Sequence, residues 1–138
     1  MKILLAACNA KYIHSNLAVY DLKAYSSDYD KEVLLREYTI NQPKDEMLKD
    51  IYGSGADVVC FSCYIWNIEQ IRKLAADLKM ACPELLLTAG GPEASSRGPA
   101  FARENPWVDF VLRGEGEYPF YRLCQVLHEP QRALETVP

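Results

Sequence analysis

The sequence predicts a three-layer α/β sandwich in which helices cover both faces of a five-stranded parallel sheet. Short apolar runs alternate five times with segments in which apolar residues recur at helical spacing. The runs are apolar at successive positions, as expected for strands that are buried on both faces. The segments that connect them are short, as in domains built from repeated β-α units.

Composition narrows the class of protein before any motif is considered. The 138 residues are enough for one domain, and 49% hydrophobic with 25% charged residues is the balance of a globular protein. A net charge of −4 argues against a nucleic-acid-binding module, and no apolar run reaches the length of a membrane span. The five cysteines lie in or beside apolar segments, which indicates buried thiols in a reducing compartment. We therefore expect a cytoplasmic protein with no nucleic-acid or membrane partner.

The first half of the chain contains two predicted strands and two predicted helices. Lys2–Cys8 is apolar on both faces and predicts a buried strand, and Ser15–Ser27 has helical spacing. Glu32–Tyr38 predicts a second strand, and its charged residues place it at an edge of the sheet. Pro43 is expected to open the next helix, which Gly53 should end.

The middle of the chain contains the strongest strand signal. Asp57–Ser62 is rich in β-formers and apolar on both faces. Asn67 is a candidate N-cap of the following helix, with Gln70 as its capping-box partner. Pro83 should end that helix, and Glu84–Ala89 predicts the fourth strand.

The last third of the chain contains the fifth predicted strand and the last predicted helices. Pro99–Glu104 predicts a short helix and Asp109–Leu112 the fifth strand. Phe120 opens an amphipathic pattern that extends to Leu127. We therefore expect one domain over residues 1–127 and a linker over residues 128–138.

The strand order follows from the connections and from the polar edge strand. Right-handed crossovers with the second strand at an edge give the order 2-1-3-4-5, the flavodoxin-like member of the Rossmann-like folds. Winding reverses between the first and third strands, and ligands bind there, at the carboxyl ends of the strands. The loops to examine are therefore Asn9–Ser15, Ser62–Trp66, Gly90–Arg97 and Arg113–Pro119.

The first two loops offer single candidates rather than a catalytic set. His14 could be a metal ligand, an acid-base group or a helix cap, and the loop that holds it lacks the glycines of a phosphate-binding turn. Cys60 and Cys63 form a C-x-x-C, but strand alternation points them to opposite faces, so we interpret them as buried thiols rather than a metal or redox pair. Ser62 stands at a strand tip, where its hydroxyl could bond a ligand or simply end the strand.

The last two loops are rich in glycine. Gly90 and Gly91 follow the fourth strand and would let a ligand or another backbone approach closely. Glu115 lies between Gly114 and Gly116, where it could cap the last helix. Small residues, hydroxyls and aromatics together suit a large, mostly uncharged ligand with a flat apolar part. No catalytic triad or metal cluster emerges from the sequence.

Four motifs in order resemble one family. They are the Asn9–Asn16 segment, the Phe-Ser-Cys-Tyr at the end of strand three, the Gly-Gly-Pro-Glu after strand four, and the Arg-Gly-Glu-Gly-Glu after strand five. Together they resemble the N-terminal cobalamin-binding domain of radical S-adenosylmethionine (radical SAM) enzymes, from Met1 to about Leu127. In the wider cobalamin-binding fold, an Asp-x-His-x-x-Gly motif supplies a histidine to cobalt. Here Tyr12 replaces the aspartate and Leu17 the glycine, so the motif around His14 is broken.

The resemblance implies a set of cofactor-binding residues. Ser62 would bond the displaced dimethylbenzimidazole tail of cobalamin, and Gly90 and Gly91 would leave room for it. The remaining implied contacts to the cofactor come from Asn9, His14, Tyr64, Gly114, Glu115 and Gly116. In many radical SAM members no protein group ligates the cobalt, so the resemblance predicts no metal ligand from this chain.

The resemblance also implies that cofactor positioning and catalysis belong to two different domains. The chain has no C-x-x-x-C-x-x-C, the spacing that holds the 4Fe-4S cluster of a radical SAM domain. We therefore expect this domain to be non-catalytic alone and to position the corrin for a downstream radical SAM domain of the same protein. That domain would bind S-adenosylmethionine and the cluster, and would perform methyl transfer or a radical rearrangement.

Three alternatives share the predicted fold. A signalling receiver would need an aspartate where Ser62 stands and a lysine where Arg113 stands. A flavin-binding electron-transfer domain could stack Tyr64, Trp66 or Tyr118 on its cofactor, but it lacks a phosphate loop. The third alternative is an interaction domain that keeps the fold and binds no cofactor.

Overall fold

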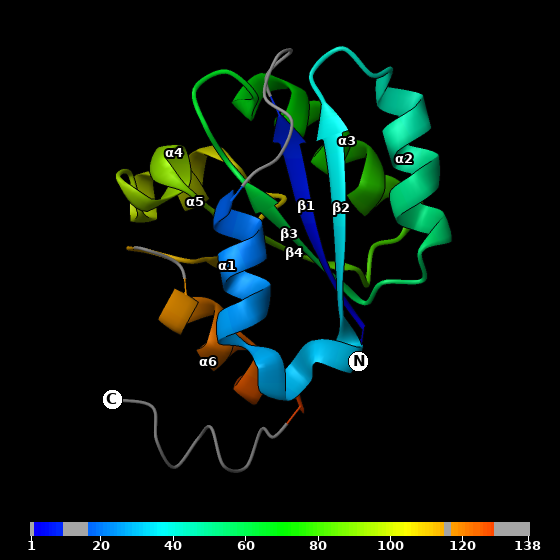
Figure 1. Ribbon diagram of the computed structural model, residues 1–138. Helices are drawn as coiled ribbons and strands as arrows, with labels where there is room; N and C mark the ends of the chain where they lie inside the picture. Colours follow the sequence, from blue (N-terminus) through cyan, green and yellow to red (C-terminus); the bar gives the residue numbers. More distant parts are fainter. Residues whose placement is uncertain (1, 10–16, 115–116, 129–138) are drawn as a thin grey trace.

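The computed structural model describes residues 2–9, 17–114 and 117–128 of the chain. His14, Glu115 and Gly116, and the expected linker from residue 129 onward, lie outside these residues. Strands and helices alternate along the sequence (Figure 1). The strands are β1 (Ile3–Asn9), β2 (Val33–Thr39), β3 (Val58–Ser62), β4 (Leu86–Gly90) and β5 (Phe110–Val111). The helices are α1 (Leu17–Tyr25), η1 (Ser27–Glu32, a 3-10 helix), α2 (Lys44–Gly53), α3 (Ile68–Ala81), α4 (Pro92–Ser95), α5 (Pro99–Glu104) and α6 (Glu117–His128).

The sheet has the predicted order and direction. Its strands run β2-β1-β3-β4-β5, and every neighbouring pair is parallel. All seven residues of β1 are buried, which explains why this strand is apolar at successive positions. The second strand lies at an edge, as its charged residues predicted, and Arg36 is exposed there. The fold class predicted from the sequence is confirmed.

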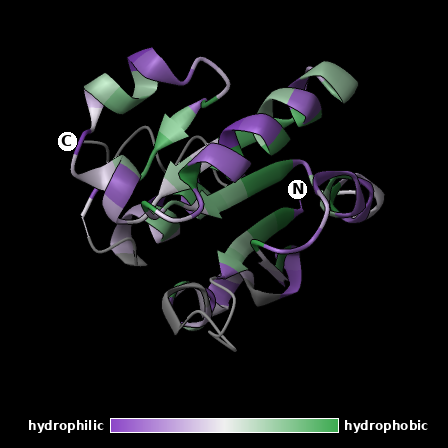
Figure 2. Cartoon of the chain, turned by 90° about the horizontal axis from the view of Figure 1, so that it is seen from above, coloured by the Kyte–Doolittle hydropathy of each residue, from purple (hydrophilic) through white to green (hydrophobic). Residues whose placement is uncertain are grey.

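Two apolar cores lie on opposite faces of the sheet. One core joins the sheet to α2, α3 and α5, with Met47, Leu74 and Phe101 among its buried side chains. The other joins it to α1, η1 and α6, where Phe120 and Tyr29 are buried. Seen from above, the strands are mostly green, and purple hydrophilic residues lie on the helices around them (Figure 2). Alternating side chains of the same strands therefore supply both cores.

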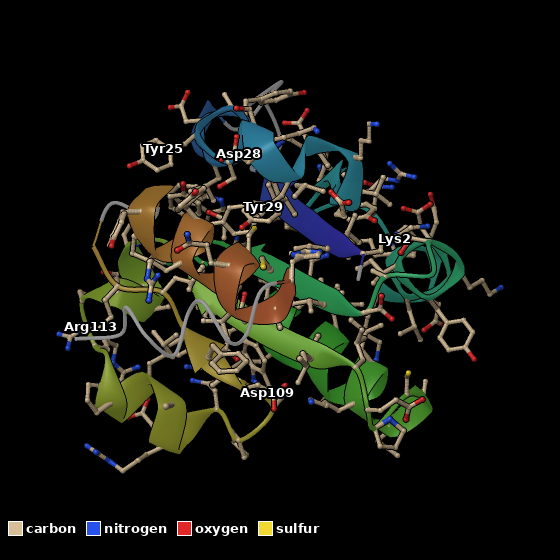
Figure 3. The ribbon with its side chains drawn as sticks, turned by 90° about the horizontal axis from the view of Figure 1, so that it is seen from below. Lys2, Tyr25, Asp28, Tyr29, Asp109 and Arg113 are labelled. Atoms are coloured by element: carbon tan, nitrogen blue, oxygen red, sulfur yellow. The ribbon has the colours of Figure 1, made fainter. Side chains whose placement is uncertain are left out.

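Aromatic side chains pack η1 against α6. Tyr29 stacks on His128 with ring centroids 5.2 Å apart and lies 5.9 Å from the ring of Tyr121. From below, Tyr29 is seen to extend from η1 toward α6 (Figure 3). His128 is the last residue of α6, whereas the sequence predicts that it begins the linker.

Three local expectations need correction. The segment after β4 was expected to be a loop, but Pro92 opens the short helix α4, because proline is already set for a first helical position. Asn67 occupies the N-cap of α3 without a side-chain capping bond, so the predicted capping box with Gln70 does not form. Of the cysteines expected to be buried, Cys82 is partly exposed.

The described helices include none that is long and apolar enough to cross a membrane.

Candidate functional site

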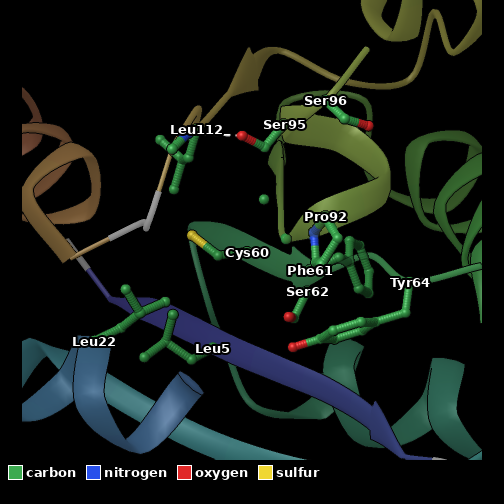
Figure 4. A pocket seen from close by; sticks show the side chains of 13 residues that line it. Leu5, Leu22, Cys60, Phe61, Ser62, Tyr64, Pro92, Ser95, Ser96 and Leu112 are labelled. Carbon is green, nitrogen blue, oxygen red and sulfur yellow. Dashed lines mark hydrogen bonds between the residues drawn. The ribbon is translucent and has the colours of Figure 1, made fainter. Parts of the chain in front are cut away.

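A cavity opens at the carboxyl ends of β1, β3 and β4, on the face of the sheet that α1 covers. Its volume is about 420 Å³. Side chains from β1, β3, α1 and α4 and from the segment after β5 line it (Figure 4). This is the position where the winding of the sheet reverses, between β1 and β3. The fold therefore creates the cavity at the place that strand order predicts for a ligand.

The pairing of the strands divides the lining into an inner and an outer row. Leu5 of β1 pairs with Cys60 of β3, and these two residues form the inner row. Ser62 of β3 pairs with Gly90 of β4, two residues nearer to the strand ends, and these form the outer row. Two residues of strand correspond to about 7 Å. The cavity thus runs from a polar mouth to an apolar inner end.

The inner end is built from two leucines and one thiol, and a third leucine lies nearer to the mouth. Leu22 of α1 lies with Leu5 and Cys60 (Figure 4). Leu112 after β5 lies beside Gly90 of the outer row, where a Cβ on Gly90 would be 3.6 Å from the Leu112 Cβ. Burial raises the pKa of the Cys60 thiol from 9.0 to about 12, so the sulfur is neutral at physiological pH. The inner end therefore presents uncharged, mainly hydrocarbon surface.

The Ser62 hydroxyl is the buried polar group of the outer row that is free to bond a ligand. Ser62 is only 8% exposed, and its hydroxyl makes no hydrogen bond to any residue that the structure describes. It points into the cavity, on the side of Tyr64 (Figure 4). A buried hydroxyl without a partner is costly in free energy, and a ligand that bonds to it removes this cost. The hydroxyl predicted to bond a ligand is therefore available to do so.

Gly91 brings the loop after β4 against the loop after β3. It has φ +87°, and a Cβ there would lie 2.7 Å from the carbonyl oxygen of Cys63. The Cys63 N–H donates to the Gly90 carbonyl at 2.8 Å, and the Glu93 N–H donates to the Cys63 carbonyl at 3.1 Å. Only glycine fits between these backbones. Gly91 thus shapes the wall of the cavity through the backbone, as well as lining it.

Asn67 connects three segments behind the mouth. Its buried amide donates to the carbonyls of Cys8 at 3.0 Å and Ser62 at 3.1 Å, and its Oδ1 accepts from the Tyr64 N–H at 2.8 Å. These bonds join the ends of β1 and β3 to the turn before α3. The sequence interpretation gave Asn67 only a capping role, because local spacing does not show which distant carbonyls an amide will meet.

The structure brings most, but not all, of the predicted contacts together. Ser62, Tyr64, Gly90, Gly91 and Gly114 line the cavity, and the Gly114 N–H donates to the Ser95 hydroxyl at 2.6 Å. The Tyr64 ring also stacks on Trp66, with centroids 4.4 Å apart. The Asn9 amide instead donates to Glu37 of β2 at 3.2 Å, and Asn9 is not among the lining residues.

The lining includes residues that the sequence interpretation did not select. These are Leu5, Leu22, Cys60, Phe61, Pro92, Ser95, Ser96 and Leu112. Helical spacing placed Leu22 near a buried face, but its position opposite β3 depends on how α1 packs on the sheet. The two cysteines of the C-x-x-C belong to opposite cores, as alternation predicted, with Cys60 beside α6 and Cys63 beside α3. Among the described residues, no group of three or more potential metal ligands comes together.

Comparison with known families and proteins shows what this chain is similar to. The family model described as "B12 binding domain" matches residues 3–124. A cobalamin-dependent radical SAM methyltransferase of Streptomyces tokunonensis is 40% identical over 67 residues, which cover 49% of this chain and 10% of that protein. An anaerobic magnesium-protoporphyrin IX monomethyl ester cyclase of Cereibacter sphaeroides is 25% identical over 114 residues, covering 83% of this chain and 18% of that protein. The chain therefore spans a small part of the length of these relatives.

Solved structures share the fold. A cobalamin-binding protein of Desulfitobacterium hafniense DCB-2 superposes with a TM-score of 0.63 at 11% identity, covering 90% of this chain and 57% of that one. A CheY-like protein of Pseudomonas aeruginosa PAO1 superposes with a TM-score of 0.56 at 14% identity, covering 100% and 98%. At such identities the likeness concerns the fold alone, which several functions share.

Proposed function

The chain belongs to the B12-binding domain family, and on that premise we propose that it holds cobalamin with the nucleotide tail of the cofactor in the cavity beside β3 and β4. The observation that carries the proposal is the outer row, where the buried Ser62 hydroxyl has no partner among the described residues and faces an opening beside Gly90, which has no side chain. A flat, mostly apolar group fits the inner end, and a polar atom near the mouth can bond to Ser62. The residues present thus fit the group that the family binds.

The chain's own residues would bind, orient and shield the cofactor. Ser62 would bond the tail, the three leucines would exclude water from it, and Tyr64 and Gly114 would lie at the rim. Bound cobalamin supplies a cobalt centre suited to methyl transfer or radical rearrangement, while the protein supplies placement and shielding. We propose no protein ligand to the cobalt, because the sequence around His14 departs from the ligating motif.

We further propose that this domain positions cobalamin for a radical SAM domain of a larger protein. The Streptomyces tokunonensis relative, named as a cobalamin-dependent radical SAM methyltransferase, supports this proposal. S-adenosylmethionine and a 4Fe-4S cluster would belong to that second domain, since the chain lacks the three-cysteine spacing that holds such a cluster. The domain described here would then contribute binding and placement rather than catalysis, and methyl transfer is the reaction that we favour.

Reconstitution with hydroxocobalamin tests the proposal. The chain should give a coloured complex that survives desalting, whereas flavin mononucleotide should not be retained. Ser62→Ala should weaken cobalamin binding by about threefold to tenfold, since one hydrogen bond is worth about 1 kcal/mol. It should leave the melting temperature nearly unchanged, because the hydroxyl has no partner among the described residues.

Two further variants make the test specific. Gly90→Val adds a side chain where the nearest atom to a new Cβ is 3.6 Å away, so the fold should accept it while the cavity fills and cobalamin binding falls. Ser27→Ala, at an exposed position outside the lining of the cavity, is the matched control and should bind like the unchanged chain. Failure to retain cobalamin, or unaltered binding by Gly90→Val, would contradict the proposal. Retention of the flavin instead would favour the electron-transfer alternative.

A further inference from the structure

The inner end of the cavity differs chemically from its mouth. The three residues that close it, Leu5, Leu22 and Cys60, present alkyl groups or a neutral thiol. The hydroxyls of the lining belong to Ser62, Tyr64, Ser95 and Ser96 (Figure 4). Ser62 lies in the outer row, two residues nearer to the strand ends than Cys60. The inner end thus has hydrophobic surface without a strong hydrogen-bonding side chain.

The backbone around the inner end does not supply the missing polar partners. Leu5 and Cys60 are paired within the β1–β3 ladder, and Cys60 is also paired with Thr88 of β4. The Leu112 N–H donates to the Ala89 carbonyl at 2.8 Å. Thr88 does carry a hydroxyl, but it is fully buried and is not among the lining residues. The side chains that line the inner end therefore offer a polar atom no stronger partner than the Cys60 thiol, so such an atom would lose its water without adequate compensation.

From this arrangement we infer that the cavity selects among corrinoids by their lower base, preferring an apolar benzimidazole to adenine. This inference rests on the proposed function, since it requires that the tail enter the cavity. The methyl groups of dimethylbenzimidazole gain free energy from burial against leucine side chains. Adenine carries an exocyclic amine and extra ring nitrogens, which would be desolvated there without partners. One such buried and unsatisfied group corresponds to about tenfold or more in affinity.

Three corrinoids test the inference on the unchanged chain. Equilibrium dialysis would compare cobalamin, the corresponding corrinoid with adenine as its lower base, and cobinamide, which has no nucleotide tail. Cobalamin should bind at least about tenfold more tightly than the adenine form, and cobinamide should bind most weakly. The readout is the dissociation constant of each corrinoid, so it does not depend on enzymatic activity.

A pair of matched variants assigns the preference to the inner end. Leu22→Asn places an amide in the cavity, where it can bond to the adenine amine, and should reduce the ratio of the two affinities at least about threefold. Leu48→Asn is the control, because Leu48 is also half-buried on a helix but packs on the opposite face of the sheet. It should lower stability in a similar way and leave the ratio unchanged.

Each outcome separates the inference from the proposed function. Equal affinity for the two tailed corrinoids would overturn the selectivity and leave cobalamin binding in place. Cobinamide binding as tightly as cobalamin would overturn both the inference and the proposed placement of the tail, because the tail would then contribute nothing. Absence of binding by all three would overturn the proposed function, and the inference with it.

Discussion

At the scale of the residue, Asn67 joins three segments of the chain through one side chain. Its amide bonds to two carbonyls and one N–H from three segments, and the side chain is buried. Asn67→Ala should therefore lower the free energy of unfolding by about 2–4 kcal/mol, since it leaves several buried backbone groups without partners. Urea unfolding measures this, with Asn41→Ala at an exposed turn position as the control. A loss no larger than that of the control would contradict the role assigned to Asn67.

Gly91 is a second residue whose surroundings exclude a side chain. Its φ of +87° is unfavourable for any residue with a Cβ, and the new atom would lie 2.7 Å from a carbonyl oxygen. We expect Gly91→Ala to lower the free energy of unfolding by at least about 2 kcal/mol.

Gly53→Ala is the matched control for this substitution. Gly53 ends α2, and a Cβ there meets nothing within 4 Å. The control should leave stability unchanged or raise it by about 0.5–1 kcal/mol. Thermal melting compares the two variants, and equal melting temperatures would show that the loop after β4 can move away from Cys63.

At the scale of the element, β5 is short, and one carboxylate adds a bond to β4 beside the backbone pairing of the two strands. Asp109 precedes this two-residue strand, and its Oδ2 accepts from the Leu87 N–H at 2.8 Å and from Lys79 Nζ at 2.7 Å. Asp109→Ala should lower the free energy of unfolding by about 1–2 kcal/mol. Asp109→Asn should cost less, because its amide oxygen can still accept from Leu87. The comparison uses urea unfolding, and identical losses in both variants would contradict the importance of that backbone bond.

Gln70 shows how an element can be fixed by contacts that its own sequence does not reveal. Its side chain was expected to cap α3, but its amide donates to the Ile40 carbonyl at 3.3 Å and to the Gln42 carbonyl at 3.4 Å. The same helix contacts α2 on this face of the sheet. Gln70 therefore ties α3 to the segment between β2 and α2, and the N-terminus of the helix is held by Asn67 in a different way.

At the scale of the whole molecule, buried thiols make the folded state less stable at alkaline pH. Burial raises the pKa of Cys60, Cys63 and Cys124 to about 12 and that of Cys8 to about 11, from 9.0. A raised pKa means that the folded state retains protons which the unfolded chain releases above pH 9. The stabilisation is therefore complete below pH 9 and is lost as pH rises toward 11 and 12.

The expected result is a free energy of unfolding that is steady from pH 7 to 8 and falls above pH 9. Each buried thiol contributes up to about 1.4 kcal/mol per pH unit in that range. Urea unfolding at several pH values under reducing conditions measures the slope, and Cys63→Ala should make it shallower. Equal stability at pH 7.5 and pH 10 would contradict this prediction.

The sequence by itself determined the fold class and the strand order, and it predicted that a cavity would lie at the carboxyl ends of the strands. These features follow from local signals: apolar runs such as that of β3, helical spacing such as that of α6, and charged residues in the edge strand β2. Ser62, Gly90 and Gly91 could be selected as site residues because strand ends are visible in the sequence. His14, Glu115 and Gly116 remain predictions, since they lie outside the described residues.

Only the tertiary structure decided what the site is made of. The Ser62 hydroxyl, which no described residue bonds, the apolar inner end and the three bonds of Asn67 depend on which distant residues become neighbours. That is set by the register between strands and by the packing of α1 on the sheet. Asn9 stands at the predicted strand end, yet the register of β1 with β2 brings its amide to Glu37 instead of the cavity. Local periodicity determines which elements form, whereas contacts between elements far apart in the chain determine what the resulting cavity can bind.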